Sequence, residues 1–245
     1  MRAWVLAALL AAGPARAEVA VLTTGAFKPV VQAMAEPFKA ATGEAVRVTN
    51  DTAGGVLRLM RAGTQVDVVV STAPGLAVMA AEGLVVADSR VDLARVGIGV
   101  AVRADAPLPP LATTDEFRAA LLAARSVAII DPAAGGTSGI YLVDLFGRMG
   151  IGAEMQAKLL RVPGGLAADR VAEGTADMAL QQVSELGVPG TVVAGMLPEG
   201  VQSYTVYSGA VSAKAGNVEQ ARAFLRELSG VTAGRVAAEK GMSRP

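Results

Sequence analysis

The sequence predicts an α/β protein built from two lobes. Short apolar strands alternate with helices along nearly the whole chain, and a strand, a small-residue turn and a helix follow one another both early and late in it. Strands separated by helical stretches are typical of right-handed βαβ units and a parallel sheet. The length of 245 residues suits one large or two small domains.

The first half of the chain alternates strands and helices regularly. Val30, Met34 and Phe38 recur at helical spacing, Pro37 is expected to kink that helix, and Gly43 is expected to end it. The strands are expected at residues 18–24, 45–49, 66–71 and 96–102, and the helices at residues 26–42, 54–62 and 73–82.

The second half continues the pattern after a proline-rich stretch at residues 104–113, which reads as a linker or a boundary turn. Thr114 is a candidate N-cap for the helix that follows. The strands are expected at residues 126–130, 159–162, 177–180, 191–193 and 203–212, and the helices at residues 115–124, 139–149, 166–173, 217–228 and 231–240.

The N-terminus, residues 1–17, predicts a secretory signal peptide. Arg2 precedes a short apolar run, and Ala15-Arg16-Ala17 has the small residues of a cleavage site. The run is too short for a membrane anchor, since a bilayer requires ~20 apolar residues. We expect cleavage after Ala17, a mature chain from Glu18, and a periplasmic location. The chain has no cysteine, so neither a lipoprotein anchor nor a disulfide is expected.

The composition excludes several classes of site. Without cysteine or histidine the chain cannot form a Ser-His-Asp triad, a Cys-His pair or a histidine or thiolate metal site, and we expect no metal and no cofactor. Lys plus Arg and Asp plus Glu balance at 22 each without a basic patch, which argues against nucleic-acid binding. Any catalysis would use Lys, Tyr, Ser, Thr or carboxylates.

Four small-residue turns follow a strand and open a helix. They lie at residues 23–28, 50–55, 135–139 and 163–166. The start of a helix leaves N–H groups unpaired and carries partial positive charge, so it is suited to an anion. Caps and tight turns use the same residue types, and one such turn alone reads as structural. Four of them favour an anion site, and the lack of Walker A and G-x-G-x-x-G patterns disfavours a nucleotide.

Five stretches carry a resemblance to a known family. They are "LTTGAFKPVVQAMAEPFKAATG", "AGGVLRLMRAGTQVDVVVST", "SRVDLARVGIGVAVR", "DPAAGGTSGIY" and "GTADMALQQVSEL", in the family's order. The chain resembles the periplasmic solute-binding proteins of ABC importers with the type 2 fold. It is most similar to the molybdate-binding branch, which also includes aconitate-isomerase-like members.

The resemblance implies two Rossmann-like lobes joined by two crossing strands, with the ligand trapped when the lobes close. Lobe one is expected to be residues 18–97 plus 208–245, and lobe two residues 98–207. The crossing strands are expected at residues 96–103 and 203–212.

The resemblance also implies a set of ligand-binding residues. They are Thr24, Gly25, Ala26, Thr52, Ala53, Gly54, Ser71, Thr137, Ser138, Gly139, Gly165 and Gln182. The family places serine hydroxyls where this chain has Gly25 and the Ala53-Gly54 pair, and a tyrosine near Gln182. These departures leave two ligands open: a molybdate- or tungstate-like oxyanion, or a small organic carboxylate.

The resemblance leaves three functions open. The first is a monomeric binding protein, not an enzyme, that captures a small anion and delivers it to an inner-membrane ABC permease. The second is a cofactor-independent isomerase of a tricarboxylic acid such as aconitate, with Lys28, Asp51 and Tyr141 as the candidate acid–base residues. The third is a sensor that passes the state of the ligand to a membrane partner.

Overall fold

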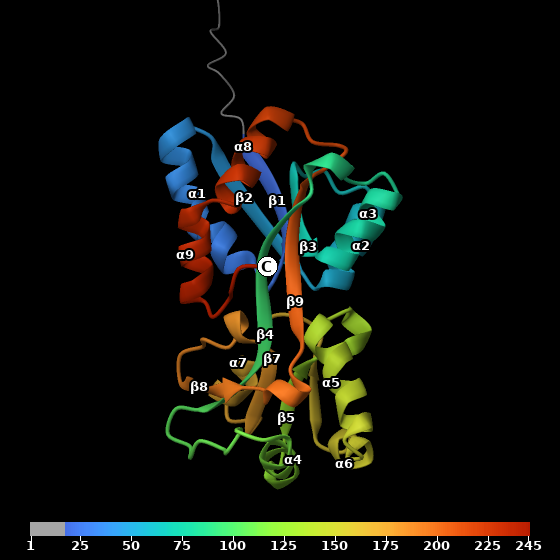
Figure 1. Cartoon of the computed structure of the whole chain (residues 1–245), viewed down its shortest axis with the longest axis vertical. Helices are drawn as coiled ribbons and strands as arrows, with labels where there is room; N and C mark the ends of the chain where they lie inside the picture. The colour runs from blue at the N-terminus through green and yellow to red at the C-terminus, as the bar shows by residue number, and fades with distance from the viewer. Residues whose placement is uncertain (1–17) are drawn as a thin grey trace, which may run out of the picture.

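The computed structural model describes residues 18–245 of the chain. The expected signal peptide, residues 1–17, lies outside the described residues. Figure 1 shows two lobes stacked along the longest axis and joined by two long strands, β4 (Val91–Arg103) and β9 (Tyr204–Val211). The expectation of an α/β fold with two lobes and two crossing strands is confirmed.

The upper lobe contains both ends of the described chain. Its elements are β1 (Glu18–Thr24), α1 (Lys28–Thr42), β2 (Ala45–Asp51), α2 (Ala53–Arg61), β3 (Val68–Thr72), α3 (Ala73–Ala81), α8 (Val218–Leu228) and α9 (Val231–Glu239). Strand β1 pairs in parallel with β2 and β3, as the βαβ pattern predicts. The carboxyl ends of β1 and β2 therefore point toward the lower lobe.

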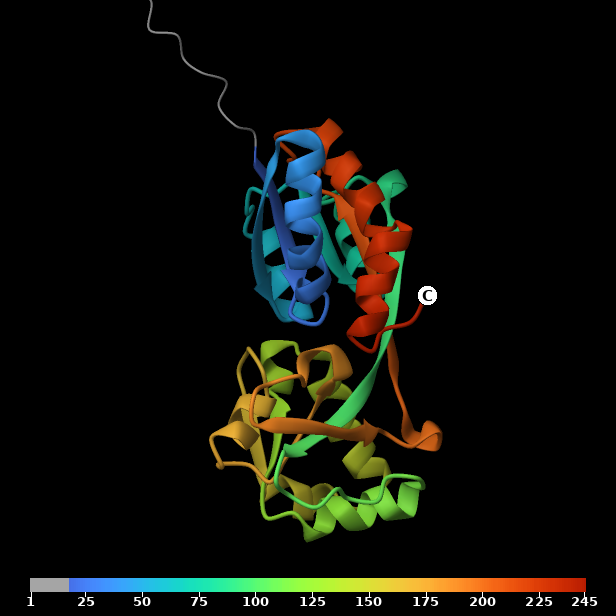
Figure 2. The same ribbon diagram turned by 90° about the vertical axis from the view of Figure 1, so that its left-hand side faces the viewer.

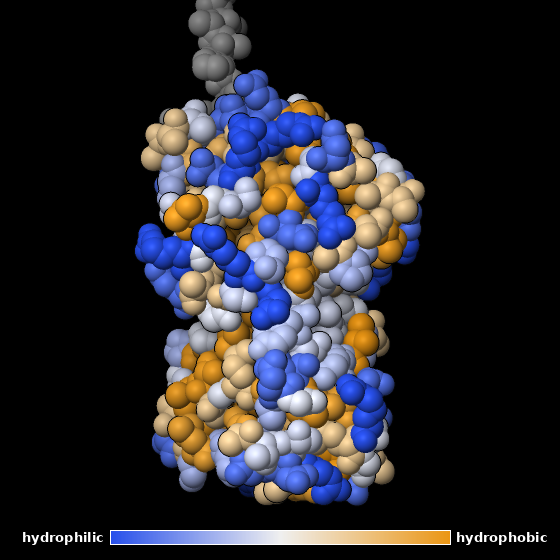
Figure 3. Space-filling model, viewed as in Figure 1, coloured by the Kyte–Doolittle hydropathy of each residue, from blue (hydrophilic) through white to orange (hydrophobic). Residues whose placement is uncertain are grey.

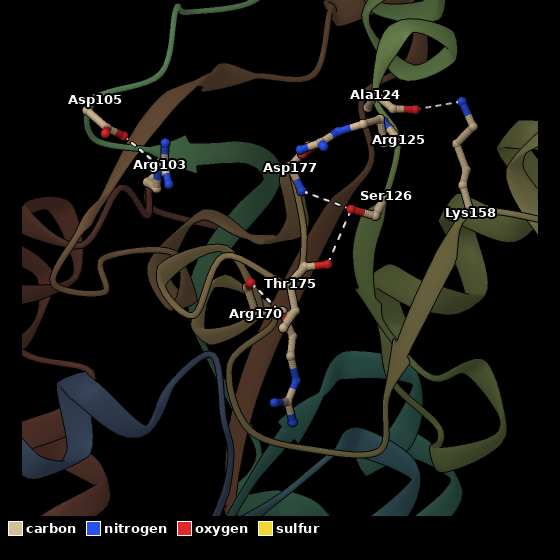
Figure 4. A network of polar contacts seen from close by, with 9 residues as sticks. All are labelled: Arg103, Asp105, Ala124, Arg125, Ser126, Lys158, Arg170, Thr175 and Asp177. Carbon is tan, nitrogen blue, oxygen red and sulfur yellow. Dashed lines mark hydrogen bonds and ion pairs between the residues drawn. The ribbon is translucent and has the colours of Figure 1, made fainter.

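The lower lobe is built around a second parallel pair. Its elements are α4 (Thr114–Ala123), β5 (Val127–Ile130), α5 (Thr137–Arg148), α6 (Gly152–Gln156), β6 (Leu159–Val162), α7 (Ala168–Ala172), β7 (Met178–Gln182) and β8 (Thr191–Met196). Strand β5 pairs in parallel with β6 and β7. Ion pairs and hydrogen bonds fix the end far from the upper lobe, where Asp177 binds Arg125 at 2.7 Å and Lys158 donates to the carbonyl of Ala124 (Figure 4).

The sheet is mixed, because antiparallel pairs join the parallel strands that the βαβ pattern predicts. Strand β9 runs antiparallel to β3 and β4, and β4 runs antiparallel to β7 and β8. The reason is topological, because β4 carries the chain from the upper lobe to the lower one and β9 brings it back. Figure 2 shows the crossing strands along one side of the junction, with the turns of the two lobes facing each other across it.

Each lobe has its own apolar core. Along β4, Val96 packs in the core of the upper lobe and Ile98 in that of the lower lobe. Three apolar residues of β8, Val192, Val193 and Met196, are each at least 36% exposed, and Figure 3 shows apolar surface on this side of the lower lobe. None of the helices in residues 18–245 is both long and apolar enough to cross a membrane.

Local details differ from expectation at several places. The N-cap of α4 is Thr113 rather than Thr114, because Thr113 forms a reciprocal capping box with Glu116. Helix α1 continues through Pro37 to Thr42. Helix α6 was not expected, since its five residues give too few positions for a helical period to show.

A buried carboxylate ties together distant parts of the upper lobe. Asp67 is 7% exposed, and its oxygens accept from the N–H groups of Ala20 at 2.8 Å, Gly216 at 2.8 Å and Asn217 at 3.2 Å. It therefore links the start of β1 to the segment that leads into α8.

We predict that Asp67→Ala lowers the free energy of unfolding by about 3 kcal/mol, because buried N–H groups lose a charged acceptor. Urea denaturation of the mature protein measures this. The control is Asp105→Ala, which removes an exposed pair with Arg103 and should cost less than ~1 kcal/mol. Equal effects of the two substitutions would contradict the role assigned to Asp67.

Candidate functional site

A cavity of about 760 Å³ lies between the two lobes. The upper lobe contributes the turn before α1, the turn before α2 and the end of α9. The lower lobe contributes the start of α5, the turn at residues 164–166 and the segment that follows β7. Segments more than 150 residues apart in the sequence thus form one wall.

The first turn borders the cavity. Helix α1 begins at Lys28 after the N-cap Phe27, and no side chain caps it. The N–H groups of Lys28 and Val30 donate to carbonyls within the turn at 3.2 Å and 3.1 Å, and Pro29 has no N–H. Thr24, at the end of β1, is 3% exposed, and its hydroxyl oxygen has no hydrogen-bond partner. This hydroxyl is a buried, unpartnered polar group next to the cavity.

The second turn joins the two lobes directly. The hydroxyl of Thr52 caps α2 by accepting from the N–H of Gly55 at 3.0 Å, and donates to the carbonyl of Ala134 in the lower lobe at 2.5 Å. The N–H of Gly54 donates to the next carbonyl, Gly135, at 3.1 Å. The structure is therefore a closed form, in which the backbones of the two lobes are in contact.

Glycine is required at this contact. A Cβ on Gly54 would lie 2.8 Å from the Cα of Gly135, and a Cβ on Gly135 would lie 2.6 Å from the Cα of Gly54. Neither backbone atom can move aside as the tip of a side chain can. Gly135 also has a φ of 79°, a conformation that residues with a Cβ rarely adopt.

The third turn places Thr137 and Ser138 of α5 against the cavity. Gly139 does not line it; the residue packs against the carbonyl of Ile130 so closely that a side chain there would collide with the oxygen. The helix start thus contributes its own N–H groups and two hydroxyls, while Gly139 lets α5 approach β5.

The side chains of the two glutamines at the end of β7 make different contacts. Gln181 orders the fourth turn, because its side chain accepts from the N–H of Ala167 at 2.7 Å and donates to the carbonyl of Gly165 at 3.1 Å. Gln182 donates to the hydroxyl of Thr205 at 3.0 Å, while its side-chain oxygen is buried without a partner. This oxygen is a second unpartnered polar group in the cavity wall.

Glu185 is the residue that the sequence analysis missed. It ends a short 3-10 helix, η3 (Val183–Glu185), and lies in the cavity wall. Its carboxyl oxygen faces Gly25 of the upper lobe so closely that a side chain at Gly25 would collide with it. The carboxyl keeps some accessible surface toward the cavity, but protein surrounds it otherwise, and this burial raises its pKa to about 8.

Most of the expected binding residues border the cavity. These are Thr24, Gly25, Ala26, Thr52, Ala53, Thr137, Ser138, Gly165 and Gln182, together with the acid–base candidates Lys28 and Asp51.

Four of the expected residues do not line the cavity: Gly54, Ser71, Gly139 and Tyr141. Tyr141 instead donates to the carbonyl of Val201 at 2.9 Å. Ser71 is fully buried, and a Cβ on Gly75 of α3 would lie 3.1 Å from its hydroxyl.

Nothing in the local sequence marked Glu185. Its neighbours in "QQVSEL" are unremarkable for the end of a strand, and its burial depends on Gly25 of the other lobe. Among residues 18–245, no group of three or more Asp and Glu side chains is arranged to hold a metal ion.

The chain was compared with known proteins. Residues 19–243 match the bacterial extracellular solute-binding protein family. The chain belongs to this family. An aconitate isomerase from Pseudomonas sp is 34% identical to it over 241 residues, which cover 96% of this chain and 90% of the relative. This confirms the resemblance stated from the sequence, including the isomerase-like members of the branch.

Solved structures of other binding proteins have the same fold. The periplasmic molybdate-binding protein of Azotobacter vinelandii superposes with a TM-score of 0.78 at 19% identity, over 93% of this chain and 99% of that one. The sulfate-binding protein SubI of Mycobacterium tuberculosis H37Rv gives 0.73 at 19% identity, over 93% and 87%. The family identifies the chain as a solute-binding protein that acts outside the cytoplasm, with a small ligand and a transporter as the typical partners.

We predict that Gly54→Val holds the lobes apart, because the new side chain would collide with the backbone of Gly135. Small-angle scattering should give a larger radius of gyration for the variant than for the wild type. Gly147→Ala is the control, since a Cβ there meets nothing within 4 Å. Superimposable curves for Gly54→Val and wild type would refute the contact.

We also predict a pH dependence of stability that belongs to Glu185. Its pKa is raised in the folded protein, so the folded state holds the proton more tightly than the unfolded chain does. The wild type should therefore lose stability relative to Glu185→Gln as the pH rises from about 5 to about 8. Urea denaturation across this range measures the difference. Parallel profiles for the two proteins would show that the carboxyl is not buried.

Proposed function

We propose that the protein is a periplasmic isomerase that binds a tricarboxylate, aconitate, between its lobes and moves a proton along the allylic carbons. The observation that carries the proposal is a cavity between the lobes whose wall combines three helix starts with the half-buried carboxyl of Glu185. In this proposal the protein is a monomer, exported and cleaved after Ala17, and uses no cofactor.

The helix starts suit a ligand with several carboxylates. The N-termini of α1, α2 and α5 border the cavity from both lobes, and each carries partial positive charge that favours an anion. Lys28 and Lys240 add cationic side chains to the wall. A ligand with three negative groups would draw on all three helix starts at once and hold the lobes closed.

The size of the cavity favours an organic acid over a bare oxyanion. Its volume of about 760 Å³ is roughly 25 times the ~30 Å³ that one water occupies in the liquid. Gly25 and Ala53 stand where the molybdate-binding branch supplies serine hydroxyls, which leaves room rather than ligands. The hydroxyl of Thr24 and the side-chain oxygen of Gln182 remain unpartnered for the polar groups of a larger molecule.

Glu185 favours an isomerase over a carrier. A carboxyl is a poor neighbour for an anion that only has to be held, because its ionised form repels the ligand. Moving a proton between two carbons, in contrast, requires a group that accepts and returns a proton. The aconitate isomerase relative, 34% identical over almost the full chain, supports the same choice.

A carrier that delivers a small anion to an ABC permease is the second candidate. The match to the solute-binding family over residues 19–243 favours it. The two candidates differ in ligand response, since a carrier of oxyanions should be stabilised by molybdate, tungstate or sulfate and not by aconitate. Stabilisation by bound ligand follows RT ln(1 + [L]/Kd), ~2.7 kcal/mol at one hundred times Kd.

We predict that the mature protein converts trans-aconitate to cis-aconitate, because the cavity supplies both anion binding and a proton carrier. The products are measured by proton NMR during incubation at pH 8, with heat-denatured protein as the blank, and thermal shifts are recorded for both isomers, citrate, molybdate and sulfate. No turnover combined with a shift for molybdate alone would contradict the isomerase and favour the carrier.

A further inference from the structure

We propose that Glu185 is the catalytic residue that carries the proton from one carbon of the substrate to the other. This inference rests on the proposed function. It assigns the chemistry to a residue outside the acid–base candidates of the sequence analysis, Lys28, Asp51 and Tyr141.

The position of Glu185 supports the assignment. Its carboxyl projects from η3 in the lower lobe to the point where Gly25 of the upper lobe approaches. A ligand held by the starts of α1 and α5 would lie against this carboxyl, since all three border one cavity. The missing side chain at Gly25 is what leaves space for the carboxyl in the closed form.

The other titratable groups of the cavity fit the task less well. They are Lys28, Asp51, Tyr207, Glu239 and Lys240. Asp51 already accepts from the N–H of Thr52 at 2.7 Å, and Glu239 and Lys240 are exposed at the end of α9. Tyr207 is 2% exposed, and burial raises the pKa of its hydroxyl, so it does not ionise near neutral pH. Lys28 is cationic and is better suited to bind a carboxylate.

One acid–base group is enough for the reaction, because the proton that it removes from the substrate is the proton that it returns. The carboxylate of Glu185 takes a proton from the methylene carbon of aconitate, so that a C–H bond breaks and an O–H bond forms. The electron pair spreads over the allylic carbons and the neighbouring carboxylate, whose added charge is stabilised by the N–H groups at a helix start. The O–H bond then breaks as the proton is returned to the carbon that was vinylic, and the double bond has moved. Nothing is oxidised or reduced.

The environment of Glu185 suits this cycle. A carboxylate with a raised pKa is a stronger base than an exposed one, and a value of about 8 is near the working pH, where general bases are most effective. The reaction starts from the ionised form. kcat/KM should therefore rise with pH and level off above about 8. Lys28, Asp51, Tyr207, Glu239 and Lys240 are the other charged or titratable groups that face the cavity and bear on this profile.

The test compares Glu185→Gln with wild type in turnover and in binding. Glutamine keeps the shape of the side chain but cannot accept and return a proton. We expect kcat for trans-aconitate to fall at least ~100-fold, the lower range for loss of acid–base catalysis. The thermal shift caused by trans-aconitate should persist. Glu227→Gln, on the exposed side of α8, is the matched control and should keep wild-type turnover.

Each outcome separates the inference from the function on which it rests. Loss of turnover with binding retained, and a wild-type kcat/KM that rises to a plateau above about pH 8, support Glu185 as the proton carrier. Wild-type turnover that Glu185→Gln preserves within a few-fold overturns the inference alone. Absence of turnover in the wild type overturns the proposed function, and the inference with it.

Discussion

The closed form depends on the contact between two backbones at Gly54 and Gly135. The hydrogen bond between them is 3.1 Å long, and the hydroxyl of Thr52 adds a second bond to the adjoining carbonyl of Ala134. Only residues without a side chain allow the lobes to approach this far. Gly25 and Gly241 of the upper lobe also lie close to the lower lobe, where a Cβ on either would meet the side chain of Glu185 or Val183.

The contact between the lobes also positions Glu185. Its carboxyl lies against Gly25 of the upper lobe, and burial raises its pKa to about 8. The same contact brings the starts of α1 and α2 opposite the start of α5. In the proposed function, anion binding and proton transfer would therefore both depend on this contact.

The sequence predicted the parts of this molecule that are set locally. The strand at residues 159–162 was located to the residue, and three of the turns were recognised as helix starts by their small residues. Pairing between distant strands was not predictable in this way, so the antiparallel run of β9 against β3 and β4 was missed. The roles of individual glycines could not be told apart from the sequence either. Gly25 borders the cavity, whereas Gly139 allows α5 to pack against Ile130. Glu185 was missed because its burial comes from residues about 160 positions away.

The most direct test of the account is a titration of the Glu185 carboxyl itself. Carbon NMR of protein labelled at the glutamate side-chain carboxyl carbon, compared with Glu185→Gln, identifies its signal. We expect one glutamate signal that titrates near pH 8 and is absent from the variant. If every glutamate signal has finished titrating by about pH 6, as solvated carboxyls do, the closed cavity around Glu185 does not form in solution and the account is contradicted.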